Sequence, residues 1–276
     1  KISHKMVQPT LKSNLEIIIP IGNISNGDTK TRLSSNLNNI QRKNLTVWLL
    51  NHVVNIAYNG LSQLNMNPNI TILSNTYPKS RFDYISHIYS MKNQIHIQCL
   101  GNSLNDSLQQ YIGLSHNVNK LILPADLGMI TIDDIVNCIK KSGDFKTPVI
   151  AKATKDNGTN GLLLPLGNDF IFKFGENSFD SHRKILNKYK MINSLGFNND
   201  IDDYSDLLKL IRNNNNIQKI IDIEKKVVIP TNKFEHIGNG INTNCKCHIL
   251  DLPNDIKLRE SKNLIYNNKS IDISIN

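Results

Sequence analysis

The sequence predicts an α/β fold with a mostly parallel sheet, and two recurring patterns support this prediction. Short apolar runs, which are typical of buried strands, recur along the chain. They occupy residues 15–19, 70–73, 95–100, 121–123 and 148–152. Stretches with helical spacing of apolar residues alternate with them, at residues 37–57, 81–91, 104–112 and 132–139. This alternation indicates parallel strands joined by right-handed helical crossovers, with helices on both faces of the sheet.

The composition fits one large domain, or a medium domain with an appendage, in a chain of 276 residues. The net charge is +9, but Lys and Arg are scattered and form no basic helix. We therefore expect a basic surface, or a small polyanionic ligand such as a nucleotide, and no nucleic-acid partner. No stretch has the apolar length of a signal peptide or a membrane span, which predicts a cytoplasmic protein without a membrane partner.

A polar loop follows the first predicted strand. Residues 22–35 are rich in Gly, Asn, Ser and Thr, and they include Lys30 and Arg32. A long loop at this place in an α/β sheet is a candidate phosphate-binding element, in which cationic side chains bind the anion. The alternative is a solvated surface loop. In the helix that follows, we interpret His52 as an ordinary packed or half-exposed histidine.

Asn105 lies just after a glycine-containing turn, Gly101-Asn102-Ser103, at the start of a predicted helix. A strand, a turn and a helix N-terminus in this order form a base- or anion-recognition site in many nucleotide-binding proteins. Asn105 is therefore a candidate for contacting a base edge. The alternative is that its side chain simply faces water.

Asp126 follows the apolar run at residues 121–123. Open α/β sheets bind ligands at the carboxyl ends of their strands, so this carboxylate is a candidate functional group. The alternative is that Asp126 only caps the next turn. Further along, Thr131 and Asp134 match a capping-box pattern. We therefore expect Asp133 and Asp134 to stabilise a helix start and not to be catalytic.

A second candidate anion site lies within residues 156–189. Residues 170–174 are predicted to form a strand, and Ser178 is predicted to be the N-cap of a helix over residues 179–189. This arrangement leaves the backbone N–H groups of residues 175–179 free for a phosphate.

Three acids lie within the four residues Asp200-Ile201-Asp202-Asp203. Acids at alternate positions of an extended segment point to the same side of the backbone. Asp200 and Asp202 can therefore share a cation.

Several segments stand in the order and spacing of one known family, over residues 15–212. They are Ile18-Ile19-Pro20, Thr29-Lys30-Thr31-Arg32-Leu33, Ser103-Leu104-Asn105, Leu123-Pro124-Ala125-Asp126-Leu127, Gly158-Thr159-Asn160, Phe174-Gly175-Glu176-Asn177-Ser178-Phe179 with His182, and Asp200-Ile201-Asp202. The chain resembles the guanylyltransferases of coenzyme F-420 (deazaflavin) biosynthesis, which activate 2-phospho-L-lactate or phosphoenolpyruvate with GTP.

The resemblance implies a nucleotidyltransferase with a mixed, mostly parallel α/β sheet of the glycosyltransferase-A-like, Rossmann-like kind. It implies transfer of GMP to the phosphate of the acceptor, release of pyrophosphate, Mg²⁺ as cofactor and a homodimer. The partners are then GTP and a small phosphorylated carboxylic acid. The implied catalytic residues are Lys30 and Asp126, the GTP-binding residues are Lys30, Arg32 and Asn105, and the acceptor-binding residues are Thr159, Gly175 and Ser178. The candidate metal ligands are Asp126, Asp200 and Asp202, and the choice between Asp200 and Asp202 as the second ligand stays open.

Two other functions are compatible with the same segments. One is a related nucleotidyltransferase with another acceptor, such as molybdopterin or a sugar phosphate. The other is a nucleotide-binding module without catalysis, which the presence of Asp126, Asp200 and Lys30 argues against.

The resemblance predicts a nucleotidyltransferase domain at residues 1–212 and leaves residues 213–276 as a C-terminal extension of unknown role. The extension contains an expected strand at residues 226–229. It also contains Cys245-Lys246-Cys247-His248, whose three possible zinc ligands lack a second ligand pair at a usual spacing. Within the domain, the short spacing between His182 and Asp200 predicts that a strand of the family is missing or shortened.

Overall fold

The computed structural model describes residues 14–22, 29–74, 95–99, 101–114, 117–167, 169–214, 217, 263–266 and 269–272. For residues 95–99, 263–266 and 269–272 it describes the backbone alone. The helix expected at residues 81–91, the strand expected at residues 226–229 and the Cys245–His248 segment lie outside the described residues. The domain boundary at residue 212 stays a prediction.

A seven-stranded mixed sheet, in the order β3-β2-β1-β4-β6-β5-β7, forms the centre of the fold. Its strands are β1 (Leu15–Ile21), β2 (Ile70–Ser74), β3 (Ile95–Cys99), β4 (Asn119–Ile122), β5 (Val149–Lys152), β6 (Thr159–Leu164) and β7 (Lys190–Ile192). Only β6 pairs antiparallel with its neighbours β4 and β5 in this sheet, and the other pairs are parallel. The predicted mixed, mostly parallel sheet is therefore confirmed.

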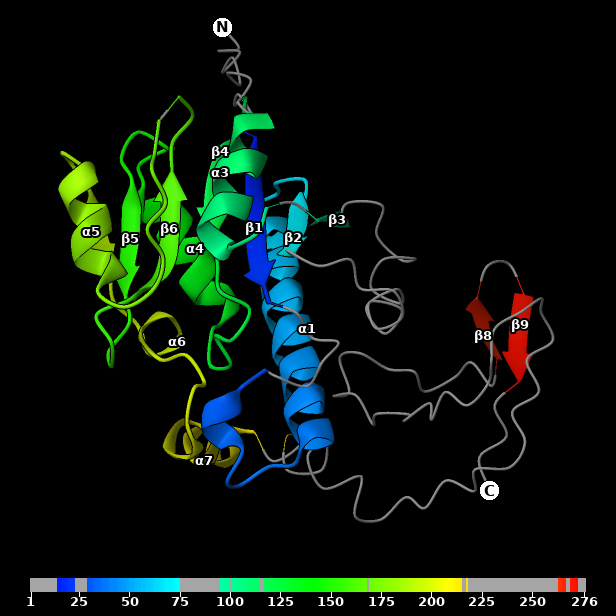
Figure 1. Ribbon diagram of the computed structural model, residues 1–276. Helices are drawn as coiled ribbons and strands as arrows, with labels where there is room; N and C mark the ends of the chain where they lie inside the picture. Colours follow the sequence, from blue (N-terminus) through cyan, green and yellow to red (C-terminus); the bar gives the residue numbers. More distant parts are fainter. Residues whose placement is uncertain are drawn as a thin grey trace, which may run out of the picture.

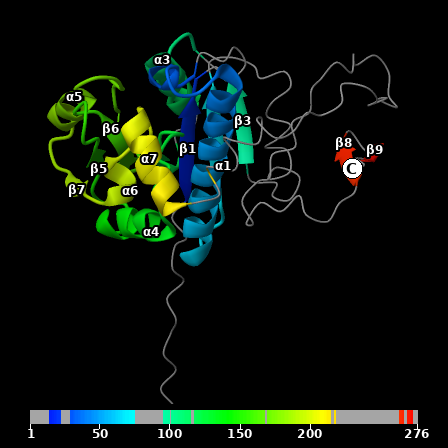
Figure 2. The ribbon, with the colours of Figure 1, turned by 90° about the horizontal axis from the view of Figure 1, so that it is seen from below.

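Helices cover both faces of the sheet, as the sequence predicts. They are α1 (Asn39–Gln63), α3 (Leu104–Leu114), α4 (Ile132–Lys141), α5 (Ser178–Ile185), α6 (Leu195–Asn198) and α7 (Tyr204–Asn213), with a short 3₁₀ turn at Thr31–Leu33. In Figures 1 and 2, α3 lies on one side of β1 and α4 lies on the opposite side of the strands.

Two apolar clusters fill the space between the sheet and these helices. Ile17 and Ile19 of β1 pack in one cluster with residues of α1, α4 and α7, whereas Ile18 packs in the other with Leu108 of α3 and Phe179 of α5. Successive residues of a strand point to opposite faces, so one continuous apolar run supplies both layers. This is why the fully apolar strands of the sequence are buried on both sides.

Helix α1 is longer at its C-terminal end than the predicted residues 37–57. It starts at a capping box in which Asn38 accepts from the backbone of Gln41 and the Gln41 side chain accepts from the backbone of Asn38. Gly60, near its end, lies so close to Ile135 of α4 that a Cβ atom there would be 2.8 Å from Ile135 Cγ2. The glycine thus permits the last turns of α1 to pack on α4.

The strand predicted at residues 170–174 is wrong. The segment pairs with none of the strands that the structure describes, because side chains from α3 and α5 take up its backbone groups instead. Gln109 bonds the carbonyl of Phe170 and the N–H of Phe172, and His182 Nε2 accepts from the N–H of Lys173. An extended segment whose backbone is satisfied by side chains does not need a sheet neighbour.

A short strand lies between His182 and Asp200, and the prediction that a strand of the family is missing or trimmed there stays a prediction. The short strand is the three-residue β7, which pairs parallel with β5 at one edge of the sheet. Separately, β8 (Asn263–Tyr266) and β9 (Lys269–Asp272) form a two-stranded antiparallel sheet. Among the described residues, no helix combines the length and the hydropathy required to cross a membrane.

Candidate active site

Three aspartates meet beyond the carboxyl end of β4. Asp126 follows this strand, and Asp200 and Asp202 lie between α6 and α7. One carboxylate oxygen from each lies within 4.8 Å of the others. The backbone N–H of Ile201 donates to the carbonyl oxygen of Asp126 at 3.0 Å, which ties the two segments together. We call Asp126, Asp200 and Asp202 the acidic cluster.

A buried acid, Asp206 of α7, holds the far side of the acidic cluster in place. Its Oδ2 accepts from the backbone N–H groups of Asp202 and Asp203 at 3.3 and 3.2 Å. Lys155, in the turn between β5 and β6, bonds the same oxygen at 2.6 Å. Helix α7 and the β5–β6 turn thus fix the backbone that carries Asp202.

Lys30 reaches the acidic cluster from the first loop. Its Nζ lies 2.7 Å from Asp126 Oδ2 and 3.1 Å from Asp202 Oδ1, with only 10% of the side chain exposed. Burial alone lowers the pKa of Lys30, but the charges of Asp126 and Asp202 raise it above the ordinary lysine value. Arg32 adds a second contact, from Nη1 to Asp202 Oδ2 at 2.9 Å. The cationic pair predicted in this loop lies at the acidic cluster.

A buried arginine of α1 positions this loop. Arg42 donates from Nε to the carbonyl of Thr29 at 3.2 Å and from Nη1 to the carbonyl of Leu37 at 2.9 Å. The two carbonyls bracket Lys30 and Arg32 in the chain. Charge-assisted bonds of this kind hold a loop more firmly than neutral bonds do.

The carboxyl group of Asp200 is a weaker acid than that of an ordinary aspartate. Burial, followed by the charge of Asp126, raises the pKa of Asp200 to about 6, and the bond from Asn160 Nδ2 to Asp200 Oδ1 (3.1 Å) acts in the opposite direction. Crowded carboxylates repel one another unless a cation lies between them. Carboxylate oxygens are the ligands that Mg²⁺ prefers, so the donor set of the acidic cluster fits such an ion.

A second cluster, of hydroxyl groups and one imidazole, lies beside the acidic cluster. Thr159 Oγ1 lies 3.0 Å from His182 Nδ1, and Ser178 Oγ donates to Thr159 Oγ1 at 3.4 Å. All three residues are buried. We call Thr159, Ser178 and His182 the hydroxyl cluster.

A bulge in β6 joins the two clusters. Ala151 of β5 is paired with Gly161, whereas Lys152 is paired with Thr159, so Asn160 has no partner in this ladder. Thr159 therefore contacts His182 while Asn160, the next residue, contacts Asp200. Bulges commonly re-aim side chains in this way.

The predicted N-cap role of Ser178 is wrong by one position. Asn177, with φ of 57°, precedes the first helical residue of α5, and that residue is Ser178. The expectation of free N–H groups at residues 175–179 is also wrong for three of them. The N–H groups of Asn177, Ser178 and Phe179 donate to carbonyls of Asp156, Gly175 and Asn157. Loop carbonyls, which the sequence pattern does not reveal, fill these positions.

Asn105 bonds the backbone of Phe174, the residue that precedes Gly175. Gly175 is exposed and has φ of 128°, a conformation that favours glycine. Asn105 Oδ1 accepts from the N–H of Phe174 at 2.7 Å, and its Nδ2 donates to the carbonyl of Phe174 at 3.1 Å. The amide of Asn105 is thus engaged by the backbone next to Gly175.

The family of the chain follows from a sequence comparison. Residues 15–236 match the family described as guanylyl transferase CofC like. The chain belongs to this family. It is therefore an enzyme, a nucleotidyltransferase that acts on a nucleotide and a phosphorylated substrate.

Curated relatives of this CofC-like chain carry the same activity in their names. A 2-phospho-L-lactate guanylyltransferase of Methanosphaera stadtmanae is 29% identical over 169 residues, which cover 60% of this chain and 68% of that protein. The protein of the same name from Methanocaldococcus sp. (strain FS406-22) is 27% identical over 197 residues, which cover 70% of this chain and 79% of that protein.

A solved structure supports the fold of this CofC-like protein. A Desulfovibrio desulfuricans G20 protein, described as a nucleotide-diphospho-sugar transferase, superposes with a TM-score of 0.55 at 14% identity. The superposition covers 77% of this chain and 96% of that one. At this identity the likeness concerns the fold, which confirms the predicted nucleotidyltransferase architecture.

Sequence reasoning missed two residues of the site in this CofC-like chain. The role of Asn160 depends on the bulge, although the Gly161 that follows it is a signal for such an irregularity. The sequence places His182 in the family pattern but gives no sign of its contact with Thr159, which lies 23 positions earlier in the chain.

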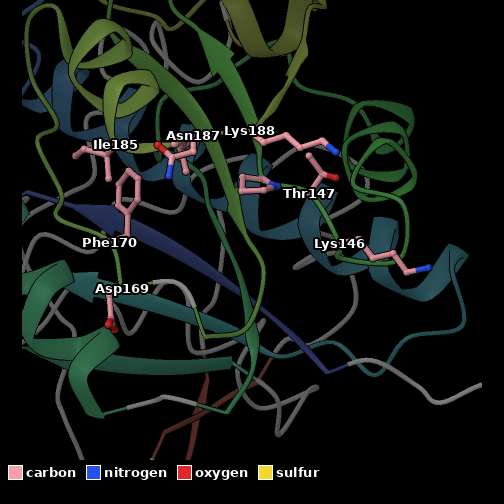
Figure 3. Close-up of a pocket in the computed structure, with 9 residues that line it drawn as sticks. Lys146, Thr147, Asp169, Phe170, Ile185, Asn187 and Lys188 are labelled. Atoms are coloured by element: carbon pink, nitrogen blue, oxygen red, sulfur yellow. The ribbon is translucent and has the colours of Figure 1, made fainter.

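A surface cavity of about 220 Å³ lies at the N-terminal end of β5 (Figure 3). Lys146, Thr147 and Pro148 line it just before β5 begins, together with residues 185–188 at the end of α5 and beyond it, and with residues 169–170. None of the candidate site residues lines this cavity. It is therefore separate from the acidic cluster.

Proposed function

We propose that the protein transfers GMP from GTP to the phosphate of 2-phospho-L-lactate, or of phosphoenolpyruvate, and releases pyrophosphate, as a step of coenzyme F-420 biosynthesis. The adjoining positions of the acidic and hydroxyl clusters are the observation that supports this proposal most. Thr159 and Asn160, consecutive in the chain, contact one cluster each. A site that joins two polyanions needs such neighbouring subsites.

The acidic cluster supports a role for Mg²⁺ as cofactor. Asp126, Asp200 and Asp202 would hold the ion, because their oxygens converge within 4.8 Å. When bound, Mg²⁺ supplies positive charge that offsets the negative charge of the α-phosphate and of the attacking oxygen. Asn160 orients Asp200 through its 3.1 Å hydrogen bond.

Lys30 and Arg32 are the groups proposed to bind the triphosphate of GTP. Both contact the acidic cluster, so phosphates that approach it come within reach of their charges. These charges stabilise the negative charge that develops on the departing pyrophosphate. The acceptor phosphate is already anionic at neutral pH, so the reaction does not require a general base.

Thr159, Ser178 and Gly175 are proposed to bind the phosphorylated acceptor. Ser178 Oγ donates to Thr159 Oγ1 and so orients the Thr159 hydroxyl, which can donate to the acceptor. The backbone at Gly175 offers an N–H group that no described residue accepts. Asn105 was predicted to bind GTP. Because its amide already bonds Phe174, we propose that it fixes the segment that carries Gly175.

The family also suggests where the enzyme is located and how it assembles. We expect a cytoplasmic homodimer whose partners are GTP and a small phosphorylated acid, with neither nucleic acid nor a membrane involved. Light scattering on the purified chain measures the mass in solution, and a monomer at all concentrations would contradict the dimer.

A pyrophosphate-release assay tests the reaction. The protein is mixed with Mg²⁺, GTP and, in separate reactions, 2-phospho-L-lactate, phosphoenolpyruvate and 3-phosphoglycerate. We expect release with one of the first two acids and none without an acceptor. Release with ATP or CTP but not with GTP would overturn the assignment of the base.

A further inference from the structure

His182 is a fully buried imidazole whose two ring nitrogens both have partners. Nδ1 lies 3.0 Å from Thr159 Oγ1, and Nε2 accepts from the backbone N–H of Lys173 at 2.9 Å. The rings of Phe170 and Phe174 flank it, with ring centroids 5.2 and 4.8 Å from its own. These contacts leave the imidazole no freedom to rotate.

The backbone of Lys173 determines which nitrogen of His182 carries the proton. A backbone N–H can only donate, so Nε2 must present a lone pair to it. Burial, and after it the charge of Lys173, lowers the pKa of His182 to about 4, which keeps the ring neutral at physiological pH. The single proton of the neutral ring therefore lies on Nδ1, and Nδ1–H donates to Thr159.

This donation determines what the hydroxyl group of Thr159 can do. Its oxygen accepts from His182 Nδ1–H and from Ser178 Oγ, which uses both of its acceptor positions. Its own proton has no acceptor among the residues that the structure describes. Thr159 is only 4% exposed, so this proton is a buried donor in need of a ligand oxygen.

We propose that His182 is a positioning residue which, by donating Nδ1–H to Thr159, directs the Thr159 hydroxyl proton to an anionic oxygen of the phosphorylated acceptor. This inference rests on the proposed function, in which Thr159 contacts the acceptor. A hydroxyl group that is free to rotate can donate or accept, whereas one with both lone pairs occupied can only donate. Such a group favours an anion over a neutral ligand.

Two substitutions of the same residue separate the donor from the acceptor of the imidazole. In His182→Asn the amide lies near the position of Nδ1 and can still donate to Thr159. In His182→Gln the amide lies near the position of Nε2, so it can accept from Lys173 N–H but leaves Thr159 without its donor.

We expect His182→Gln to raise the acceptor KM about tenfold with the KM of GTP unchanged, the size expected for one hydrogen bond to a charged group. We expect His182→Asn to keep the acceptor KM within about threefold of the wild type. Equal KM values in both variants, or a larger increase in His182→Asn, would overturn the inference.

A spectroscopic measurement does not depend on activity. NMR of the ¹⁵N- and ¹³C-labelled wild-type protein at pH 7 identifies the tautomer of each histidine, and His182→Gln assigns the signal. We expect the Nδ1–H tautomer, and an Nε2–H tautomer would overturn the inference. A wild-type protein that releases no pyrophosphate contradicts the proposed function instead, and the tautomer then still decides the hydrogen-bond direction.

Discussion

Lys30 offsets part of the negative charge of the acidic cluster. Its ammonium contacts Asp126 and Asp202, and Arg32 contacts Asp202 as well. Asp200 makes no ion pair with a described cation, and its pKa, raised to about 6 by burial and by Asp126, reflects this. Two cationic side chains face three acids, so the acidic cluster keeps a negative charge that a bound cation such as Mg²⁺ would offset.

Asp126→Asn tests the acidic cluster directly. The substitution keeps the shape of the side chain but removes one charge, so we expect kcat to fall by more than about 100-fold. Thermal unfolding checks that the fold is retained. Asp133→Asn, an exposed acid in the first turn of α4, is the matched control and should keep full activity. Near wild-type turnover of Asp126→Asn would remove this residue from the mechanism.

Ser178→Ala tests the proposed acceptor subsite. Ser178 Oγ donates to Thr159 Oγ1, so loss of the Ser178 hydroxyl frees a lone pair of Thr159 and no longer holds the Thr159 proton towards the acceptor. We therefore expect the acceptor KM to rise roughly tenfold while the KM of GTP changes little. Ser181→Ala, one turn further along α5, is the control. If steady-state kinetics give an unchanged acceptor KM for Ser178→Ala, its placement in the subsite is wrong.

Strand β6 is the element that brings the two clusters together. It is the only strand of the large sheet that runs antiparallel to its neighbours, and its bulge turns Thr159 and Asn160 to different partners. Gly161, the next residue, lies against Phe197 of α6, where a Cβ atom would be 2.7 Å from the ring. The position of β6 thus depends on the small size of this residue.

Gly161→Ala should destabilise the protein by about 1–3 kcal/mol, because Phe197 and Ala151 would have to move. Gly113→Ala in α3 is the control, since a Cβ atom there has no neighbour within 4 Å. It should stabilise by roughly 0.5–1 kcal/mol through helix propensity. Urea unfolding measures both, and equal effects would show that the contact with Phe197 is unimportant.

The sequence predicts those parts of this fold that local patterns determine. The five apolar runs became strands, and the capping box at Thr131 and Asp134 starts α4 as expected. The strand predicted at residues 170–174 does not form, because Asn105 and Gln109, more than 60 positions away in the chain, bond the backbone of this segment. The composition of a short segment does not reveal which distant residues will bond its backbone.

In the candidate site, too, some contacts could be predicted from sequence patterns and others depend on the fold. The order of motifs was enough to predict that Asp126, Asp200 and Lys30 belong together, because the family pattern reflects the fold. The ion pairs of Lys30 depend on how residues 29–37 lie against the acidic cluster, which no local pattern determines. The link from Asn160 to Asp200 depends on the bulge, so it was not predicted.

Burial of a neutral histidine couples the stability of the whole protein to pH. The folded-state pKa of His182 is about 4, below the value of about 6.5 in the unfolded chain. Between these values the unfolded chain binds more protons, so the free energy of unfolding falls as the pH decreases from 6.5 towards 4. The stabilisation is fully present only above the unfolded pKa.

We expect the wild type to lose about 2 kcal/mol more than His182→Gln between pH 7 and pH 4.5. Denaturant unfolding at the two pH values measures this difference. Acidic residues titrate in both proteins, so subtraction isolates the histidine. Equal losses would mean that His182 is not held neutral.

We propose that three aspartates from two distant segments form one metal site. A crystal of the protein with Mn²⁺ and GTP, measured for anomalous scattering from the metal, tests it most directly. We predict a peak bound by oxygens of Asp126 and of at least one of Asp200 and Asp202, next to the phosphates of GTP. A peak that none of these carboxylates contacts would contradict the account.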